Sequence, residues 1–186
     1  MATATSTHNG VDLEKLTATI DAIKSDPGLA RFTFRSSTEW MGGGHVRTEI
    51  QHFYGAGAED VSRTEPFVIE GDEPPVLLGS NQGANAVEAV LHALASCLAV
   101  GFAYNAAARG INLEALSFEL EGNLDLHAFL GLSEDTRPGY EDIRVTYHVR
   151  SDAPRDTIIE LCNYVQKTSP VLDVLRNPVP VTVKID

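Results

Sequence analysis

The stretch Ala84–Arg109 reads ANAVEAVLHALASCLAVGFAYNAAAR, and it decides the fold. Glu88 near its start and Arg109 at its end are the only residues in it with a formal charge, and both charges match the helix dipole. Because the residues between them are nearly all apolar or small, we expect one long helix that is covered on most of its faces. Small residues such as Ala93 and Gly101 let another backbone come close, so we expect a second helix here, and the same helix of a second subunit is one candidate.

Shorter elements precede this helix. Apolar residues recur at helical spacing near the N-terminus, and further on they alternate with polar residues as in strands. The predicted elements are a helix at 11–25, a hairpin of 32–35 and 46–53 that turns at 42–44, a strand at 66–70, and a loop at 71–83.

Strands and one more helix follow the long helix. We predict strands at 116–122, 143–150 and 179–185, a surface loop at 133–139, and a helix at 154–167. Runs of strands broken by single helices are typical of an α+β fold with antiparallel sheets, here around the long central helix.

The length and composition favour a single globular domain. A chain of 186 residues with 43% hydrophobic and 22% charged residues can bury a core without a second domain. We expect a flexible tail at 1–10 and one domain at 11–186, with the helix at 11–25 as an extra N-terminal element. The net charge of −12 argues against nucleic acid or an anionic membrane as a partner, because both need a basic surface.

The cysteine content and the N-terminus favour a cytoplasmic protein. Two cysteines, Cys97 and Cys162, are too few for the disulfide framework of a small secreted domain. The first ten residues have neither the basic nor the apolar region of a secretory signal. The apolar run from Ala89 is interrupted by His92 and ends at Asn105, near the lower length limit of a membrane span, so we interpret it as a core helix.

Cys97 lies well inside the long helix, and we expect it to carry whatever chemistry the protein has. Free cysteine is often a buried and inert small hydrophobe, so that interpretation stays open. A mid-helix thiol also lacks the free N–H groups that favour a thiolate at a helix N-terminus. Reactivity at Cys97 would therefore need a cation from another segment.

Two stretches of the sequence stand out together. They are GANAVEAVLHALASCL at residues 83–98 and TSPVLDVLRNPVPV at residues 168–181. Both resemble the OsmC/Ohr family, the osmotically inducible protein C and organic hydroperoxide resistance proteins. The resemblance implies an intertwined homodimer with two long central helices packed together and a site at each subunit interface. For the well-characterised members it also implies thiol-dependent reduction of organic hydroperoxides.

The resemblance also assigns roles to the cysteines. In that family a first cysteine is oxidised to a sulfenic acid and a second resolves it as a disulfide, which a dithiol later reduces. Cys97 matches the first position, but Ser169 stands at the second, where it can cap a helix that begins at Pro170 and cannot form a disulfide. Cys162 lies about 10 Å before Ser169 along a helix, and a disulfide tolerates Cα separations of only about 7 Å. A Cys97–Cys162 disulfide would need a rearrangement, and Cys162 as ordinary core is the alternative.

The residues that activate the first cysteine in the family are displaced in this sequence. The family's glutamate falls at Val87, and Glu88 is adjacent but turned by about 100°. The family's arginine falls on the predicted strand at 66–70, which holds none. Arg47 and Arg63 are nearby alternatives, and each also fits a solvated surface residue.

His92 is one helical turn after Glu88, so the two side chains can pair on one face. Two interpretations stay open for His92: a hydrogen-bonded histidine at an interface, and a general base or ligand. The remaining histidines have no metal-ligand spacing: His8, His45, His52, His127 and His148. We expect neither a metal nor a cofactor.

Two functions remain at this stage. The first is reduction of a small hydroperoxide through Cys97, with an external thiol in place of the missing second cysteine. The second is a non-catalytic homodimer that binds a small apolar ligand at the subunit interface, since the catalytic pattern is incomplete. A protein–protein adaptor is a third class, with only the acidic surface in its favour.

Overall fold

The structure is a computed structural model that describes residues 7–186. It has the expected α+β composition, with small antiparallel sheets and one long apolar helix. Two compact units divide the described chain: Asp12–Val90 forms the first, and Thr7–Val11 with Leu91–Asp186 forms the second. The assignment of residues 11–186 to one domain stays a prediction.

The first unit holds one helix and two small sheets. Its elements are α1 (Leu13–Ser25), the 3₁₀ turn η1 (Pro27–Ala30), β3 (Ser37–Gly42), β4 (His45–Ile50), β5 (Phe53–Gly55), β6 (Ala58–Asp60), β7 (Phe67–Gly71) and the 3₁₀ turn η2 (Pro75–Leu77). The predicted N-terminal helix is confirmed as α1. It begins at Leu13 because the backbone N–H of Lys15 donates to the Asp12 carboxylate at 3.0 Å, an N-cap.

The predicted first hairpin exists, but its first strand was placed too early. β3, β4 and β7 form an antiparallel sheet in that order, and the chain turns at Gly42–Gly43, which both have positive φ. The alternating segment at 32–35 lies outside this sheet. Its aromatic side chains stack instead: Phe32 and Phe34 pack on Phe53 with ring centroids 6.3 and 5.5 Å apart. The alternation therefore reflects an aromatic cluster, and only Thr33 pairs as in a strand, in a single antiparallel bridge with Tyr54.

A tight hairpin of β5 and β6 was missed by the sequence analysis. The two residues at its turn, Ala56 and Gly57, have φ values of 50° and 85°. Two positive φ values in a two-residue turn match the twist of antiparallel strands. The predicted strand at 46–53 therefore ends at Ile50, and Phe53 starts a separate ribbon.

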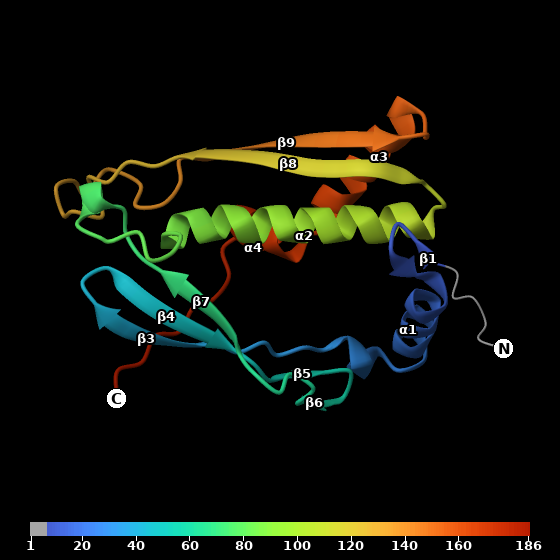
Figure 1. The fold of residues 1–186 in the computed structure, drawn as a ribbon, viewed down its shortest axis with the longest axis horizontal. Coiled ribbons are helices and arrows are strands. Elements are labelled where there is room, and N and C mark those ends of the chain that lie inside the picture. Colours follow the sequence, from blue (N-terminus) through green and yellow to red (C-terminus); the bar gives the residue numbers. More distant parts are fainter. Residues whose placement is uncertain (1–6) are drawn as a thin grey trace. The chain divides into compact units, whose positions relative to one another are not determined.

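The second unit contains the long helix and the elements that pack against it. After β1 (Thr7–His8) and the start of β2 (Val11–Asp12), its elements are α2 (Ala86–Ala108, which begins in the first unit), β8 (Leu113–Asn123), β9 (Asp142–Ser151), α3 (Arg155–Thr168) and α4 (Pro170–Arg176). β8 and β9 form a long antiparallel hairpin that runs along α2 (Figure 1). Every second residue of the hairpin faces the core, as the predicted alternation requires.

The core of this unit lies between the hairpin, α2 and α3. Leu94, Leu98 and Phe102 on one side of α2 are at most 1% exposed, and they meet Leu161 and Val165 of α3. By length and composition, α2 is the one helix in the described chain that could cross a membrane. One side of it nevertheless packs as a core helix does.

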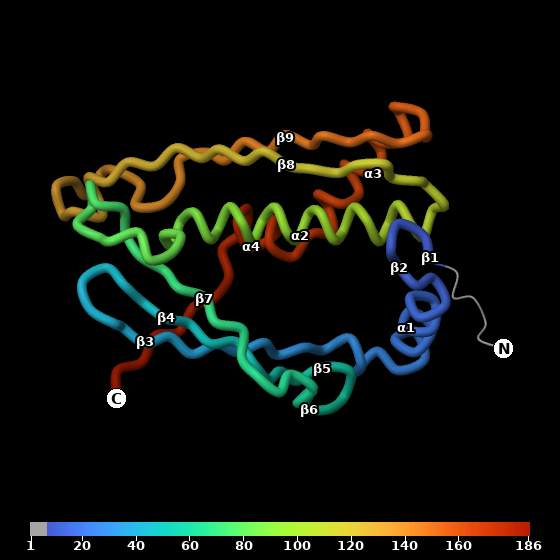
Figure 2. The backbone as a smooth tube through the Cα atoms, viewed as in Figure 1, coloured from blue at the N-terminus to red at the C-terminus, as the bar shows by residue number. Residues whose placement is uncertain are grey.

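Within the chain, the helix that packs against the central helix is α3, and packing against the same helix of a second subunit stays a prediction. A Cβ atom at Gly101 would lie only 3.2 Å from a methyl carbon of Val165, so the two backbones come close there. Figure 2 shows the tube of α3 passing α2 and continuing into α4. Gly101 thus serves helix packing within this chain.

The predicted final strand at 179–185 is wrong for this structure. The chain after Asn177 is extended but unpaired, and Val181, Val183 and Ile185 are at least 80% exposed. A strand needs a neighbouring ladder for its N–H and C=O groups, and nothing in residues 7–186 provides one here.

Part of the predicted flexible tail is ordered. Residues 1–6 lie outside the described residues, but Thr7–His8 pairs with β2. His8 and Asn9 both bond to the carbonyl oxygen of Ile111, at 2.9 and 2.8 Å, and the Asn9 oxygen accepts from the N–H of Leu113 at 2.9 Å. These bonds fix the segment to the start of β8.

Candidate functional site

The sulfur of Cys97 and the hydroxyl of Ser169 meet inside the second unit. Cys97 lies in the middle of α2, and Ser169 is the single residue between α3 and α4. The Sγ–Oγ distance is 3.1 Å, which makes a hydrogen bond. Ser169 is 6% exposed and Cys97 is half-buried, so the contact is largely sheltered from solvent.

Ser169 is also the N-cap of α4, as the sequence predicts. The backbone N–H of Leu172 donates to the Ser169 oxygen at 3.2 Å, and Pro170 occupies the first helical position. The same oxygen therefore holds the end of α4 and contacts the Cys97 sulfur, and either the hydroxyl or the thiol can donate in that second bond.

Cys162 does not lie beside Cys97. Cys97 faces Ser169, and four residues on, Gly101 faces Val165, so α2 and α3 run in opposite directions along this contact. Cys162 is thereby displaced from the level of Cys97 by about two helical turns. Both cysteines are free thiols, and burial raises the pKa of the Cys162 thiol. The geometry favours Cys162 as a core residue.

Tyr147 adds a second hydroxyl to the surroundings of these thiols. Its ring lies on the inner face of β9, with centroids 6.0 Å from Phe102 and 4.6 Å from Phe118. Its oxygen is the one buried side-chain polar atom of the described residues that has no hydrogen-bond partner. Burial first and the Cys162 thiol second raise the pKa of Tyr147 to about 12; Arg176 opposes this shift, and Cys97 adds to it.

Glu88 caps the helix that carries Cys97. Its carboxylate accepts from the N–H of Asn85 at 2.9 Å, and its own N–H donates to the Asn85 side chain at 3.0 Å. This reciprocal pair is a capping box. Nine residues separate Glu88 from Cys97, which places them on opposite sides of α2 and about 13 Å apart along its axis. Within one chain, Glu88 cannot contact the sulfur.

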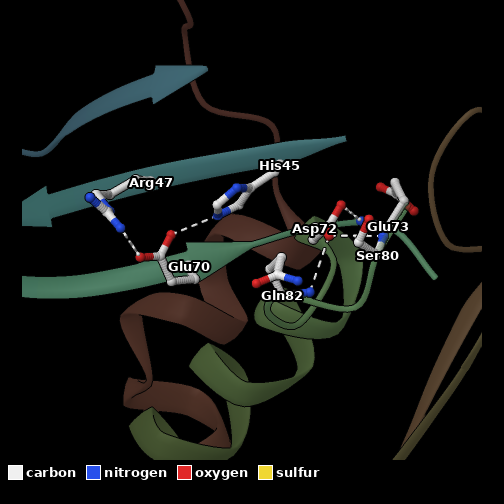
Figure 3. Close-up of polar contacts among 7 residues, drawn as sticks. All are labelled: His45, Arg47, Glu70, Asp72, Glu73, Ser80 and Gln82. Carbon is white, nitrogen blue, oxygen red and sulfur yellow. Dashed lines mark hydrogen bonds and ion pairs between the residues drawn. The ribbon is translucent and has the colours of Figure 1, made fainter. Parts of the chain in front are cut away.

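Arg47 is held by a carboxylate in the first unit (Figure 3). It donates to Glu70 across β4 and β7 at 2.8 Å, and His45 bonds to the other oxygen of Glu70 at 2.9 Å. The two bonds keep the pKa of Glu70 below its usual range. Arg63, the other candidate, lies over the rings of Phe53 and Phe67. Both arginines thus have local structural roles.

Asp72 organises the loop that leads from β7 to α2. It is 3% exposed, and its carboxylate accepts from the backbone N–H groups of Glu73, Ser80 and Gln82 at 2.8–3.1 Å (Figure 3). These bonds, that of Gln82 first, lower the pKa of Asp72. At Gly79 the chain passes so close to Glu73 that a Cβ would lie 1.8 Å from its carbonyl oxygen. The loop is therefore built around a buried anion.

His92 is exposed on α2 and makes no hydrogen bond or ion pair with residues 7–186, so the predicted pair with Glu88 is absent. Within the same residues, no group of three or more His, Cys, Asp or Glu side chains is placed to hold a metal ion.

Comparison with known proteins identifies the family. The profile described as OsmC-like protein matches residues 79–184, more than half of the chain. The chain belongs to the OsmC-like protein family. Its match includes the whole of α2, the β8–β9 hairpin, α3 and α4, and therefore both Cys97 and Ser169. No curated protein matches the sequence.

Solved structures support the same OsmC-like fold. An OsmC-like protein from Mycoplasma pneumoniae has a TM-score of 0.59 at 17% identity, over 78% of this chain and 89% of that chain. An organic hydroperoxide resistance protein OsmC from Legionella pneumophila has a TM-score of 0.50 at 17% identity, over 77% and 89%. A hypothetical protein from Aquifex aeolicus has a TM-score of 0.52 at 13% identity, over 77% and 87%. At these identities the likeness establishes the fold alone.

Sequence reasoning missed the buried hydroxyl of Tyr147 and the charge that acts on it. Tyr147 follows the alternation of β9, which indicates that it faces inward but not which thiols it approaches. Arg176 ends α4, seven residues after Ser169, and is the one cation that acts on Tyr147. The TSPVLDVLR stretch contains Arg176 and could have indicated it, because residues seven apart share a helix face.

Proposed function

We propose that this OsmC-like protein reduces small organic hydroperoxides through Cys97, with an external thiol as the reductant. The observation that carries the proposal is the 3.1 Å contact between the Cys97 sulfur and the Ser169 hydroxyl. It gives the thiol a fixed polar neighbour in an otherwise apolar core. Ser169 also occupies the position of a second cysteine, and its hydroxyl cannot form a disulfide.

The proposed reaction has three balanced steps. The Cys97 sulfur attacks the terminal peroxide oxygen, the O–O bond breaks, and a sulfenic acid and an alcohol form. An external thiol then attacks the sulfenic sulfur, which releases water and leaves a mixed disulfide. A second external thiol attacks the mixed disulfide, the two external thiols leave as their own disulfide, and Cys97 returns as a thiol. The reducing cytoplasm that we propose as the location would supply these thiols.

The test compares the wild-type protein with Cys97→Ser. Each is incubated with cumene hydroperoxide and dithiothreitol, and hydroperoxide consumption is followed over time. The proposal expects consumption by wild type and only the background rate with Cys97→Ser. Equal rates for the two proteins would end it. Cys162→Ser serves as the matched control, because its thiol lies away from the site, and it should keep the wild-type rate.

A non-catalytic member of the family is the second candidate. Glu88 is engaged in the capping box and Arg47 in the ion pair with Glu70, which favours a site without the usual activating pair. Such a protein would bind a small apolar ligand. The two candidates differ in the reactivity of Cys97: sulfenic acid formation at micromolar peroxide supports catalysis, and its absence supports the binding role.

We also propose that the protein is a homodimer built on the outer side of α2. Ala93, Ser96, Val100 and Tyr104 follow one another at helical spacing and are exposed in the single chain. An isologous contact along this side would bury them. Light scattering should give twice the monomer mass. Val100→Glu should shift the protein toward the monomer, while Ile159→Glu on the exposed side of α3 should not.

A further inference from the structure

The connection between β8 and β9, seen at the left of Figure 1, borders a hollow of about 560 Å³. Ligand sites in proteins are mostly apolar hollows of about 300–1,000 Å³ that also hold a few polar groups. The apolar part of this hollow consists of four leucines: Leu124, Leu126, Leu130 and Leu132. Leu130 and Leu132 are 57% and 69% exposed, so apolar surface faces water here and is available to a ligand.

Backbone hydrogen bonds hold these leucines in place. The N–H of Leu130 donates to the carbonyl oxygen of Leu126 at 2.9 Å, and the N–H of Leu132 donates to that of His127 at 2.8 Å. Between the two donors, Gly131 has a φ of 70°, the left-handed conformation that ends a helical turn. The hollow is therefore formed before a ligand arrives, which lowers the entropic cost of binding.

Two carboxylates border the same hollow. Asp125 accepts from the backbone N–H of His127 at 2.8 Å and from the His127 ring at 2.5 Å, and these two bonds lower the pKa of Asp125. Glu141 comes from the other end of the connection, where its N–H donates to the carbonyl oxygen of Asn123 at 2.9 Å. Among the described residues that line the hollow, none is a lysine or an arginine. At neutral pH the net charge of its lining is therefore negative, even when His127 is protonated.

We propose that this hollow binds a small organic cation, an amine with an apolar body, between the leucines and the two carboxylates. The apolar body displaces water from the leucines, and the ammonium group faces Asp125 and Glu141. An anionic ligand is disfavoured, because its charge would meet charges of the same sign. The site is separate from the proposed reaction at Cys97, so either proposal can fail without the other.

The test compares three compounds of one shape. Phenylbutylamine is a cation at neutral pH, phenylbutanol is neutral, and phenylbutyrate is an anion. Each is titrated into the isotope-labelled wild-type protein, and the backbone amide NMR signals of residues 124–132 and 141 are followed. The inference expects the amine to shift these signals saturably and to bind about fivefold more tightly than the alcohol, the order of effect of an exposed ion pair. The anion should bind more weakly than the alcohol.

Two double variants locate the charge that the amine meets. Asp125→Asn with Glu141→Gln removes both charges at the hollow and should abolish the preference for the amine while the alcohol still binds. Glu134→Gln with Asp135→Asn is the matched control, because it makes the same change in net charge on the same connection but outside the hollow. The control should keep the wild-type preference. Thermal unfolding checks that both variants fold, and if the first does not, the three compounds on the wild-type protein decide alone.

Four results would overturn the inference. The first is equal binding of the amine and the alcohol by the wild-type protein, and the second is no saturable shift by the amine, or a shift confined to other parts of the chain. The third is a preference that survives in the first variant or disappears in the control, since either marks a general attraction to the acidic surface. The fourth is a change in the signals of residues 124–132 with protein concentration alone, which shows that a second copy of the chain covers the hollow.

Discussion

The hydroxyl oxygen of Ser169 lies 3.1 Å from the sulfur of Cys97, a place from which a second sulfur could form a disulfide with little movement. A disulfide requires an S–S separation of about 2.05 Å, so a thiol at position 169 has only a short gap to close. We therefore predict that Ser169→Cys, combined with Cys162→Ser, forms an internal disulfide with Cys97 after one equivalent of hydroperoxide. The measurement is a count of free thiols, which should fall from two to none, with recovery after dithiothreitol.

The contrasting case is Cys162→Ser with Ser169 intact. Its single thiol should be oxidised to a species that dimedone traps, because no second sulfur is at hand. Persistence of both thiols in the Ser169→Cys variant after peroxide treatment would show that the two positions do not meet in solution.

The capping role of Ser169 predicts a specific difference between two substitutions. Ser169→Ala removes the acceptor for the Leu172 N–H and should lower the free energy of unfolding by about 1 kcal/mol. Ser169→Gly should cost only a few tenths of that, because glycine is tolerated at an N-cap. Urea unfolding at neutral pH measures both. Equal losses would mean that the contact with Cys97, absent from both variants, outweighs the cap.

Local patterns allowed the sequence to predict the central helix and its surroundings. The charges at Glu88 and Arg109 and the apolar run between them mark α2 to within a few residues. Alternation likewise marks β8 and β9. The strand predicted at 179–185 was wrong because a strand also depends on a distant part of the chain. Alternation shows that a segment can be a strand, but a neighbouring strand must exist for it to pair with.

Residues of the candidate site could be predicted only where a sequence motif identifies the residue by itself. Cys97 and Ser169 follow from the two motifs, and the cap at Ser169 follows from the proline after it. The buried hydroxyl of Tyr147 could not be predicted in this way, because its burial depends on the segments of α2 and α3 that lie opposite it. The roles of Glu88 and Arg47 also depend on their partners, Asn85 and Glu70, which spacing alone does not reveal.

Cys162 should be unreactive in the folded protein. Burial raises the pKa of its thiol, so a smaller fraction is thiolate near neutral pH than in the unfolded chain. We predict that iodoacetamide at pH 8 labels Cys162 more slowly in the folded protein than in urea, and that the gap narrows as the pH rises. Peptide mass spectrometry measures the label at Cys162. Equal rates in the folded and unfolded protein would contradict the buried environment.

Asp72 should make the stability of the protein depend on acid pH. Three backbone N–H groups donate hydrogen bonds to its carboxylate and lower its pKa in the folded state, so folding favours the ionised form. A lowered folded pKa means that the contribution is complete above the ordinary value near 4 and is lost as the pH falls through the folded value. Asp72→Asn should therefore lower the unfolding temperature at pH 7, because its amide group faces N–H donors. The difference from wild type should shrink toward pH 3.

Asp152→Asn, an exposed position, should leave the unfolding temperature unchanged. A constant difference between Asp72→Asn and wild type from pH 7 to pH 3 would show that the carboxylate charge does not stabilise the loop.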